Sequence, residues 1–225
     1  MARKRQHYLP TTYLKGFCNQ KGMLWTYDKQ KYDNPWECKP EKTAFEKYLY
    51  NFEDTSTENR EIIEKYFAEE IEGPAAEPLE NLRNKIFPDK DSRQKLALFF
   101  GFLLTRSPMQ LAKLKNQADL EFDAFIRACT TDKEYFAEGY KKTGITASNE
   151  EIEEDRLAIL NGEISLYINR NSSLNNMMAL GFIFSEYFVD MKWALIESVE
   201  NAYITTDNLL NILNHSNLEH RFANL

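Results

Sequence analysis

Residues 96–104 form the longest apolar run in the chain and constrain its fold more than any other stretch. The run is apolar on every face of a helix, and a helix of that kind has to be buried. Arg106 follows directly after it, and Pro108 disfavours a continuous helix because proline lacks an N–H and restricts the residue before it. The sequence therefore predicts a buried helix over about 92–107 that ends at a cation, with Asp91 or Ser92 as its cap.

The rest of the chain predicts an α+β protein that is predominantly helical, a helix bundle around the buried helix. Apolar residues keep helical spacing over 62–86, across Gly73-Pro74, which predicts one kinked helix or two nearly coaxial ones. Short antiparallel strands are expected near 23–28 and 192–206, and a weaker alternation of aromatics marks 48–52. We expect a single domain over 1–225, with flexible ends at 1–6 and 215–225. Further helices are predicted over 109–128, 135–140, 149–161, 174–190 and 208–213.

Composition excludes several classes of protein. The chain has 28 Lys and Arg against 35 Asp and Glu, a net charge of −7, so general nucleic-acid binding is not expected. No apolar run reaches the roughly 18–20 residues that span a membrane, and residues 1–20 lack the apolar region typical of a signal peptide. Its three cysteines form no CxxC pair, which indicates neither a zinc site nor a disulfide framework. P-loop, GxGxxG, GxSxG and HExxH motifs are absent. The expected location is the cytoplasm.

Four short motifs occur in a fixed order along the chain. They are HYLPTTYLKGF at 7–17, IEGPAA at 71–76, LLTRSP at 103–108 and ITTDN at 204–208. In this order the chain resembles a large, mainly bacterial family of unknown function with HYxPxxYLxxF, IEG, R-[ST]-P and [ST]-[ST]-D-N-P boxes. The resemblance implies a mixed helix–strand fold and a polar cluster built from distant segments, but no reaction. Leu209 stands where that family has proline, and the family continues with a further strand-rich segment.

The motifs supply a set of candidate site residues with distinct chemistry. A histidine titrates near neutral pH and can act as general acid or base, while an arginine offers a fork for phosphate or carboxylate. Two carboxylates could orient the histidine or hold a divalent metal. We expect no cofactor, with a divalent metal as the alternative. The candidate catalytic residues are His7, Glu72, Arg106 and Asp207, and the candidate binding residues are Tyr13, Arg106 and Asn208.

Each candidate also has a structural interpretation. Arg106 can be ion-paired to Glu72 or Asp207 to hold the fold, because a buried charge requires a partner. His7 can make a structural hydrogen bond beside Pro10, and Asp207 can cap a helix. The functional hypothesis is a hydrolase- or phosphoryl-type site or an anion-binding pocket that takes a small anionic ligand. The alternatives are a non-catalytic ligand- or protein-binding module, or a shortened, degenerate relative; a protein partner or homo-oligomer is left open, as is whether the chain is an enzyme.

Overall fold

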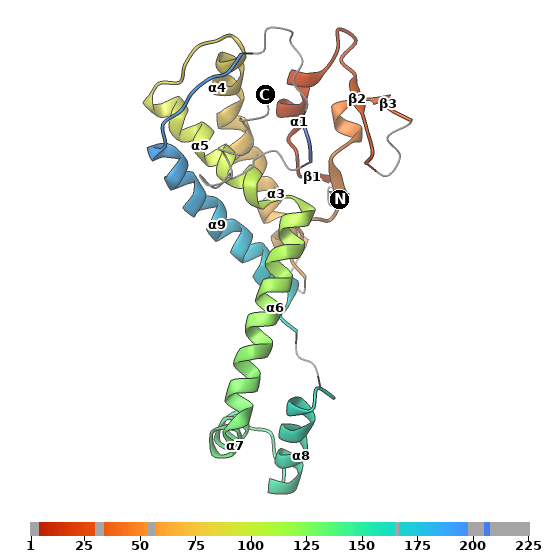
Figure 1. Cartoon of the computed structure of the whole chain (residues 1–225), viewed down its shortest axis with the longest axis vertical. Coiled ribbons are helices and arrows are strands. Elements are labelled where there is room, and N and C mark those ends of the chain that lie inside the picture. The colour runs from red at the N-terminus through yellow and green to blue at the C-terminus, as the bar shows by residue number, and fades with distance from the viewer. Residues whose placement is uncertain (1–4, 30–33, 54–56, 165–166, 198–204, 208–225) are drawn as a thin grey trace, which may run out of the picture. The chain divides into compact units, whose positions relative to one another are not determined.

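The computed structural model describes residues 5–29, 34–53, 57–164, 167–197 and 205–207 (Figure 1). The chain divides into two compact units, which we call unit 1 (Met1–Leu111 with Leu174–Leu225) and unit 2 (Ala112–Ser173). The structure is mainly helical with a few short antiparallel strands, which confirms the predicted fold class. The single-domain assignment stays a prediction. Of the predicted flexible ends, Arg5 and Gln6 belong to a strand, while residues 1–4 and 215–225 lie outside the described part.

The N-terminal half alternates short strands and short helices before the long helices begin. Its elements are β1 (Arg5–His7), α1 (Thr11–Leu14), η1 (Lys15–Phe17), β2 (Leu24–Thr26), β3 (Trp36–Cys38), η2 (Pro40–Lys42) and β4 (Phe45–Lys47). Next come α2 (Thr57–Arg60), α3 (Ile62–Tyr66), η3 (Phe67–Glu72), α4 (Gly73–Arg83) and α5 (Lys90–Thr105). The remaining helices are α6 (Pro108–Thr131), α7 (Lys133–Lys142), α8 (Asn149–Leu160) and α9 (Arg170–Asp190).

Helix α5 is the predicted buried helix, and every residue from Gly101 to Thr105 is buried. Its N-cap is Asp89, whose carboxylate accepts a hydrogen bond from the backbone N–H of Ser92 at 2.8 Å. The predicted caps, Asp91 and Ser92, were therefore wrong, because the helix begins earlier and both residues lie inside it. The helix ends at Thr105, and α6 begins at Pro108 after the predicted break.

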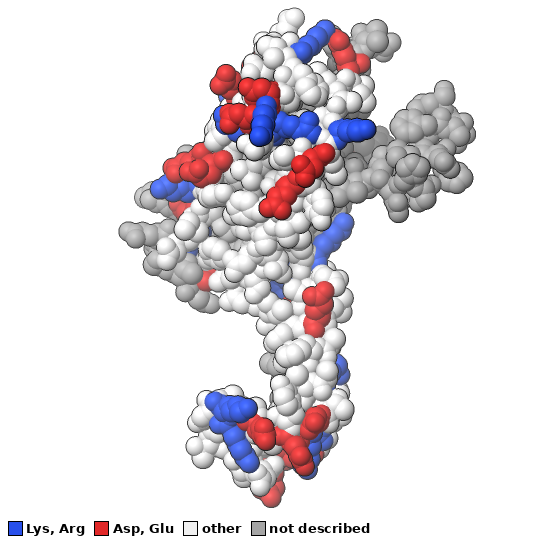
Figure 2. Space-filling view, turned by 90° about the vertical axis from the view of Figure 1, so that its left-hand side faces the viewer, with Lys and Arg blue, Asp and Glu red and all other residues white. Residues whose placement is uncertain are grey.

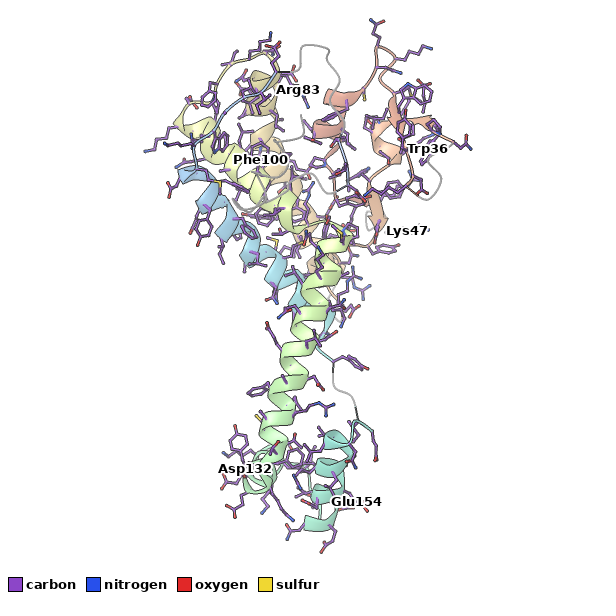
Figure 3. The ribbon with its side chains drawn as sticks, in the orientation of Figure 1. Trp36, Lys47, Arg83, Phe100, Asp132 and Glu154 are labelled. Carbon is purple, nitrogen blue, oxygen red and sulfur yellow. The ribbon has the colours of Figure 1, made fainter. Side chains whose placement is uncertain are left out.

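In unit 1, α5 packs against α4 and against α9 (Figure 1). The contact with α9 depends on two glycines, since a Cβ on Gly101 would meet the backbone of Gly181 and Ser185. Beside them, the rings of Phe102 and Phe182 meet edge to face with centroids 5.1 Å apart. Phe100 of α5 is labelled in Figure 3. Its ring contacts that of Trp193, with the two centroids 5.7 Å apart. Aromatic packing over a close helix crossing therefore forms the interior.

The predicted kinked helix over 62–86 is three consecutive segments, α3, η3 and α4. The middle one is a π-helix that ends at Glu72, directly before Gly73-Pro74. Proline cannot donate to the carbonyl four residues earlier, and its ring crowds that carbonyl, so a widened turn is a low-cost way to continue the helix. Ile71 and Ala75 remain buried on the two sides of this junction.

Each of the two sheets in the described residues is a pair of antiparallel three-residue strands. Strands β1 and β4 pair His7 with Phe45, and β2 and β3 pair Leu24 with Cys38. The strand predicted near 23–28 is confirmed, while the aromatic alternation at 48–52 follows β4 and is not a strand. Residues 192–197 and 205–207 contain no strand either, and 198–204 lie outside the described residues, as does the helix predicted over 208–213.

Unit 2 contains polar contacts that stabilise α8 and join it to the end of α6. Ser148 and Glu151 form a reciprocal capping box at the start of α8. The Arg156 guanidinium donates to both carboxylate oxygens of Glu153 at 2.9 Å and to the Thr130 carbonyl at 3.0 Å. Hydrogen bonding from Arg156 lowers the pKa of Glu153 to about 2. Of the helices that the structure describes, none is both long enough and apolar enough to span a bilayer.

Candidate functional site

Arg106 is the buried charge around which the candidate site is organised. It follows α5 as its C-cap, and its backbone N–H still donates to the Phe102 carbonyl at 3.0 Å. The chain therefore leaves the apolar helix with this side chain directed into the interior, where only 1% of it is exposed. A guanidinium cannot lose its proton in a protein, so it has to find charged and polar partners there.

The guanidinium has two polar partners and one aromatic one. Its Nη1 donates to a carboxylate oxygen of Glu72 at 2.8 Å, and its Nε donates to the Tyr8 carbonyl at 2.9 Å. The carbon at its centre lies 5.0 Å from the centroid of the Phe67 ring, a cation–π arrangement. Nη2 is buried and has no hydrogen-bond partner in the described structure. One edge of the fork is therefore unused.

Glu72 reaches Arg106 because it is the last residue of the π-helix η3. A Cβ at the following position, Gly73, would lie 3.2 Å from the Ala68 carbonyl oxygen, which is closer than most side chains approach a neighbouring atom. Glycine at this position avoids that close contact in the wide turn. The Glu72 side chain is 25% exposed, in contrast to its buried partner. The ion pair is therefore buried on the arginine side and reaches solvent on the carboxylate side.

Tyr50 and Gln6 fix the backbone around the arginine, and sequence analysis missed both as site residues. The Tyr50 hydroxyl donates to the Arg106 carbonyl at 2.9 Å, and burial raises the pKa of this tyrosine above its ordinary range. The Gln6 side chain accepts from the Tyr50 backbone N–H at 2.6 Å and donates to Asn51 at 2.6 Å. A tyrosine in an aromatic stretch and a glutamine near the N-terminus carry no sequence signal for such a role.

His7 is the last residue of β1, and its Nε2 atom is also buried without a hydrogen-bond partner. Burial lowers the pKa of the imidazole, which the charge of Arg106 lowers further; a hydrogen bond to the Glu41 backbone and the charge of Glu72 oppose this. The net result is a histidine that stays neutral at pH 7. The rings of His7 and Phe45 meet edge to face, with centroids 5.5 Å apart. The charges of Glu72 and Arg106 thus both affect His7, and an ion pair joins Glu72 to Arg106; that the three residues form a functional site stays a prediction.

Asp207 is in a different position from these three. It is exposed, and its charge raises the pKa of Tyr8, a smaller effect than that of burial. Within the described residues it forms no ion pair with Arg106. The neighbouring Thr205 hydroxyl and the Tyr13 hydroxyl are 3.1 Å apart, so the 205–207 segment contacts the first motif. Asn208 lies outside the described residues, as does the helix that Asp207 was expected to cap.

Arg83 positions Tyr13 and was not predicted to contribute. Its guanidinium donates to the carbonyls of Thr12 and Tyr13 at 2.8 and 3.2 Å, at the end of α1 (Figure 3 labels Arg83). A Cβ on Gly16 would lie 2.8 Å from the Arg83 Nε, so the glycine of the first motif leaves room for this arginine. The described part of the chain contains no group of three or more His, Cys, Asp or Glu side chains arranged to hold a metal ion.

Comparisons with known proteins give a family but no activity. The search of curated proteins and the search of solved structures found no match. A protein-family model matches residues 5–223, which include every candidate site residue. The chain therefore belongs to the family described as Protein of unknown function (DUF4238).

Proposed function

We propose that His7, Glu72 and Arg106 form a hydrolytic or phosphoryl-transfer site for a small anionic substrate. His7 is the general base, Arg106 stabilises negative charge that develops on the substrate, and Glu72 holds the guanidinium in place. Tyr13 and Asp207 are assigned to substrate binding, and so is Asn208, which lies outside the described residues. The proposal is carried by one observation: a neutral imidazole and a guanidinium of the same cluster each keep a buried nitrogen without a partner.

These two free nitrogens suit complementary tasks. With its other ring nitrogen engaged by the Glu41 backbone, His7 can accept a proton at Nε2 from water or from a substrate hydroxyl. The Arg106 Nη2 can donate to an oxygen that becomes more negative in the transition state. An unpaired buried polar atom costs free energy, which a ligand that pairs it would recover. A divalent metal held by Glu72 and Asp207 stays a prediction, and no step here requires one.

The test is turnover of p-nitrophenyl phosphate and bis(p-nitrophenyl) phosphate, followed by nitrophenolate absorbance. His7→Gln should lower kcat/KM by at least about 100-fold, the usual contribution of a general base. In the wild type, kcat/KM should fall as the pH drops through the His7 pKa, which lies below 6.5, because the protonated ring cannot accept a proton. His7→Gln should lack that limb. Lys113→Gln, an exposed change in unit 2, is the control.

A second candidate is a non-catalytic module in which the cluster holds the fold. It is favoured by the number of protein contacts that Arg106 already makes, to Glu72, Tyr8, Phe67 and Tyr50. In that case neither ester is turned over, and His7→Gln changes no rate. Equal turnover by wild type and His7→Gln, with the same pH profile, would rule out the catalytic role of His7.

A further inference from the structure

A pocket in unit 1, apart from the Arg106 ion pair, has a charge opposite to that of the whole chain. It is an open depression of about 670 Å³ between η1, the turn that leads into β2 and the start of η2. Lys15, Lys21 and Lys39 line it, together with a single carboxylate, that of Glu41. The lining residues carry a net charge of +2, with the Glu37 carboxylate hydrogen-bonded to the lining residue Asn19, whereas the whole chain carries −7. A pocket whose charge is opposite in sign to that of the chain is suited to an anionic ligand.

The three lysines are available to a ligand. All three are exposed, and none of them forms an ion pair with any described residue. The nearby carboxylate of Glu37 instead accepts a hydrogen bond from the Asn19 side chain at 2.9 Å. On the face that Figure 2 draws, by contrast, several acidic and basic side chains lie next to one another. Unpaired lysines gathered in a pocket differ from that pattern.

Short hydrogen-bonded turns fix the backbone that carries these lysines. The Asn19 side chain accepts from the backbone N–H of Lys21 and of Met23, at 3.0 and 3.1 Å. Gly22 closes the turn with a φ of 70°, a conformation that glycine adopts without strain. On the opposite side, the Lys39 carbonyl accepts from the Lys42 N–H at 2.9 Å. The pocket walls are therefore preorganised, and only the lysine side chains have to be ordered on binding.

Cys18 lines the same pocket without adding charge. Burial raises the pKa of its thiol, and the charge of Glu41 raises it further, so the sulfur stays protonated at neutral pH. The electrostatic character of the pocket is therefore set by the lysines and Glu41. Lysine ammonium groups recognise phosphate as point charges and tolerate several geometries. A volume of this size falls in the range of sites for small molecules.

We propose that this pocket binds a small phosphorylated molecule that carries at least two phosphate charges. The site is additional to the proposed hydrolytic site, because none of its lysines contacts His7, Glu72 or Arg106; the two regions meet only at Glu41, whose backbone bonds to His7. A long polyanion such as nucleic acid is not favoured, since a chain of net charge −7 repels it outside the pocket.

The test uses the full chain and inorganic tripolyphosphate as the probe, in low salt without divalent ions, by isothermal titration calorimetry. The pocket variant is Lys15→Gln/Lys21→Gln/Lys39→Gln. The control is Lys113→Gln/Lys141→Gln/Lys142→Gln, exposed lysines of unit 2, so that both triple variants change the net charge from −7 to −10. We expect the pocket variant to raise the Kd at least about tenfold and the control to stay within about twofold of wild type.

Further measurements distinguish the other possible results of this experiment. Single-stranded oligothymidylate that binds more tightly than tripolyphosphate would overturn the proposal in favour of nucleic acid. Equal loss of affinity in both triple variants, or no binding to wild type, would also overturn it. Thermal unfolding checks that the variants fold, and Lys15→Gln/Lys39→Gln provides a second, milder pocket variant. His7→Gln should keep tripolyphosphate affinity while it loses turnover, so failure of this site and failure of the hydrolytic site give different results.

Discussion

At the scale of single residues, Arg106 shows why sequence could predict a buried cation but not all of its contacts. The guanidinium was predicted because a cation follows a helix that must be buried, and its pairing with Glu72 was one of the partners considered. Its hydrogen bonds to the Tyr8 carbonyl and from the Tyr50 hydroxyl could not be predicted. They join positions far apart in the chain through backbone atoms, which every residue possesses, so no residue type marks them.

Loss of the carboxylate from the Glu72–Arg106 ion pair should destabilise the protein more than loss of a carboxylate from an exposed ion pair. Glu72→Gln should lower the free energy of unfolding by about 2 kcal/mol, because it leaves a buried guanidinium without its counter-charge; full burial of both groups would cost more. Urea denaturation followed by circular dichroism measures this loss. The matched control is Glu80→Gln, which removes an exposed pair with Arg83, and such pairs contribute about 0–1 kcal/mol. Equal losses in the two variants would show that burial of Arg106 does not set the cost.

At the scale of elements, long helices were predicted well and short strands poorly. Helix α5 and the π-helical turn before Pro74 follow from local chemistry, an apolar run and a missing N–H. The pairing of β1 with β4 joins three-residue strands about forty positions apart, and nothing in either strand specifies its partner. The aromatic stretch at 48–52 was predicted to be a strand but follows β4 without forming one, because alternation alone does not show where strand pairing occurs.

The crossing of α5 and α9 gives a prediction at this scale. Gly101→Ala should destabilise the protein by about 1–3 kcal/mol, because the new methyl group would meet rigid backbone, with Ser185 N at 2.9 Å. Gly139→Ala in α7 is the control, since no atom lies within 4 Å of its added Cβ. That change should stabilise by about 0.5–1 kcal/mol, because alanine favours helix. Thermal and urea unfolding measure both; a loss at Gly139 equal to that at Gly101 would contradict the packing argument.

At the scale of the whole molecule, the sequence predicted the family and the fold class but gave no sign of two compact units. Unit 2 begins inside α6 and ends inside α9, so no loop, proline-rich linker or change in composition marks its limits. The four motifs all fall in unit 1, in which His7, Glu72 and Arg106 come together. Unit 2 contains none of the candidate residues, and its contacts have to be understood separately.

The division into units predicts where a local change will be felt. Arg156→Gln removes the hydrogen bond that joins α8 to the Thr130 carbonyl near the end of α6, together with the pairing of Arg156 and Glu153 inside α8. Hydrogen–deuterium exchange read by mass spectrometry should then show at least about tenfold faster exchange in α8, as a local opening becomes easier. Exchange in α5 should be unchanged, because α5 lies in unit 1. Lys113→Gln should leave both helices as in wild type. If α5 and α8 accelerate together, the chain opens as one cooperative domain, as the single-domain prediction requires.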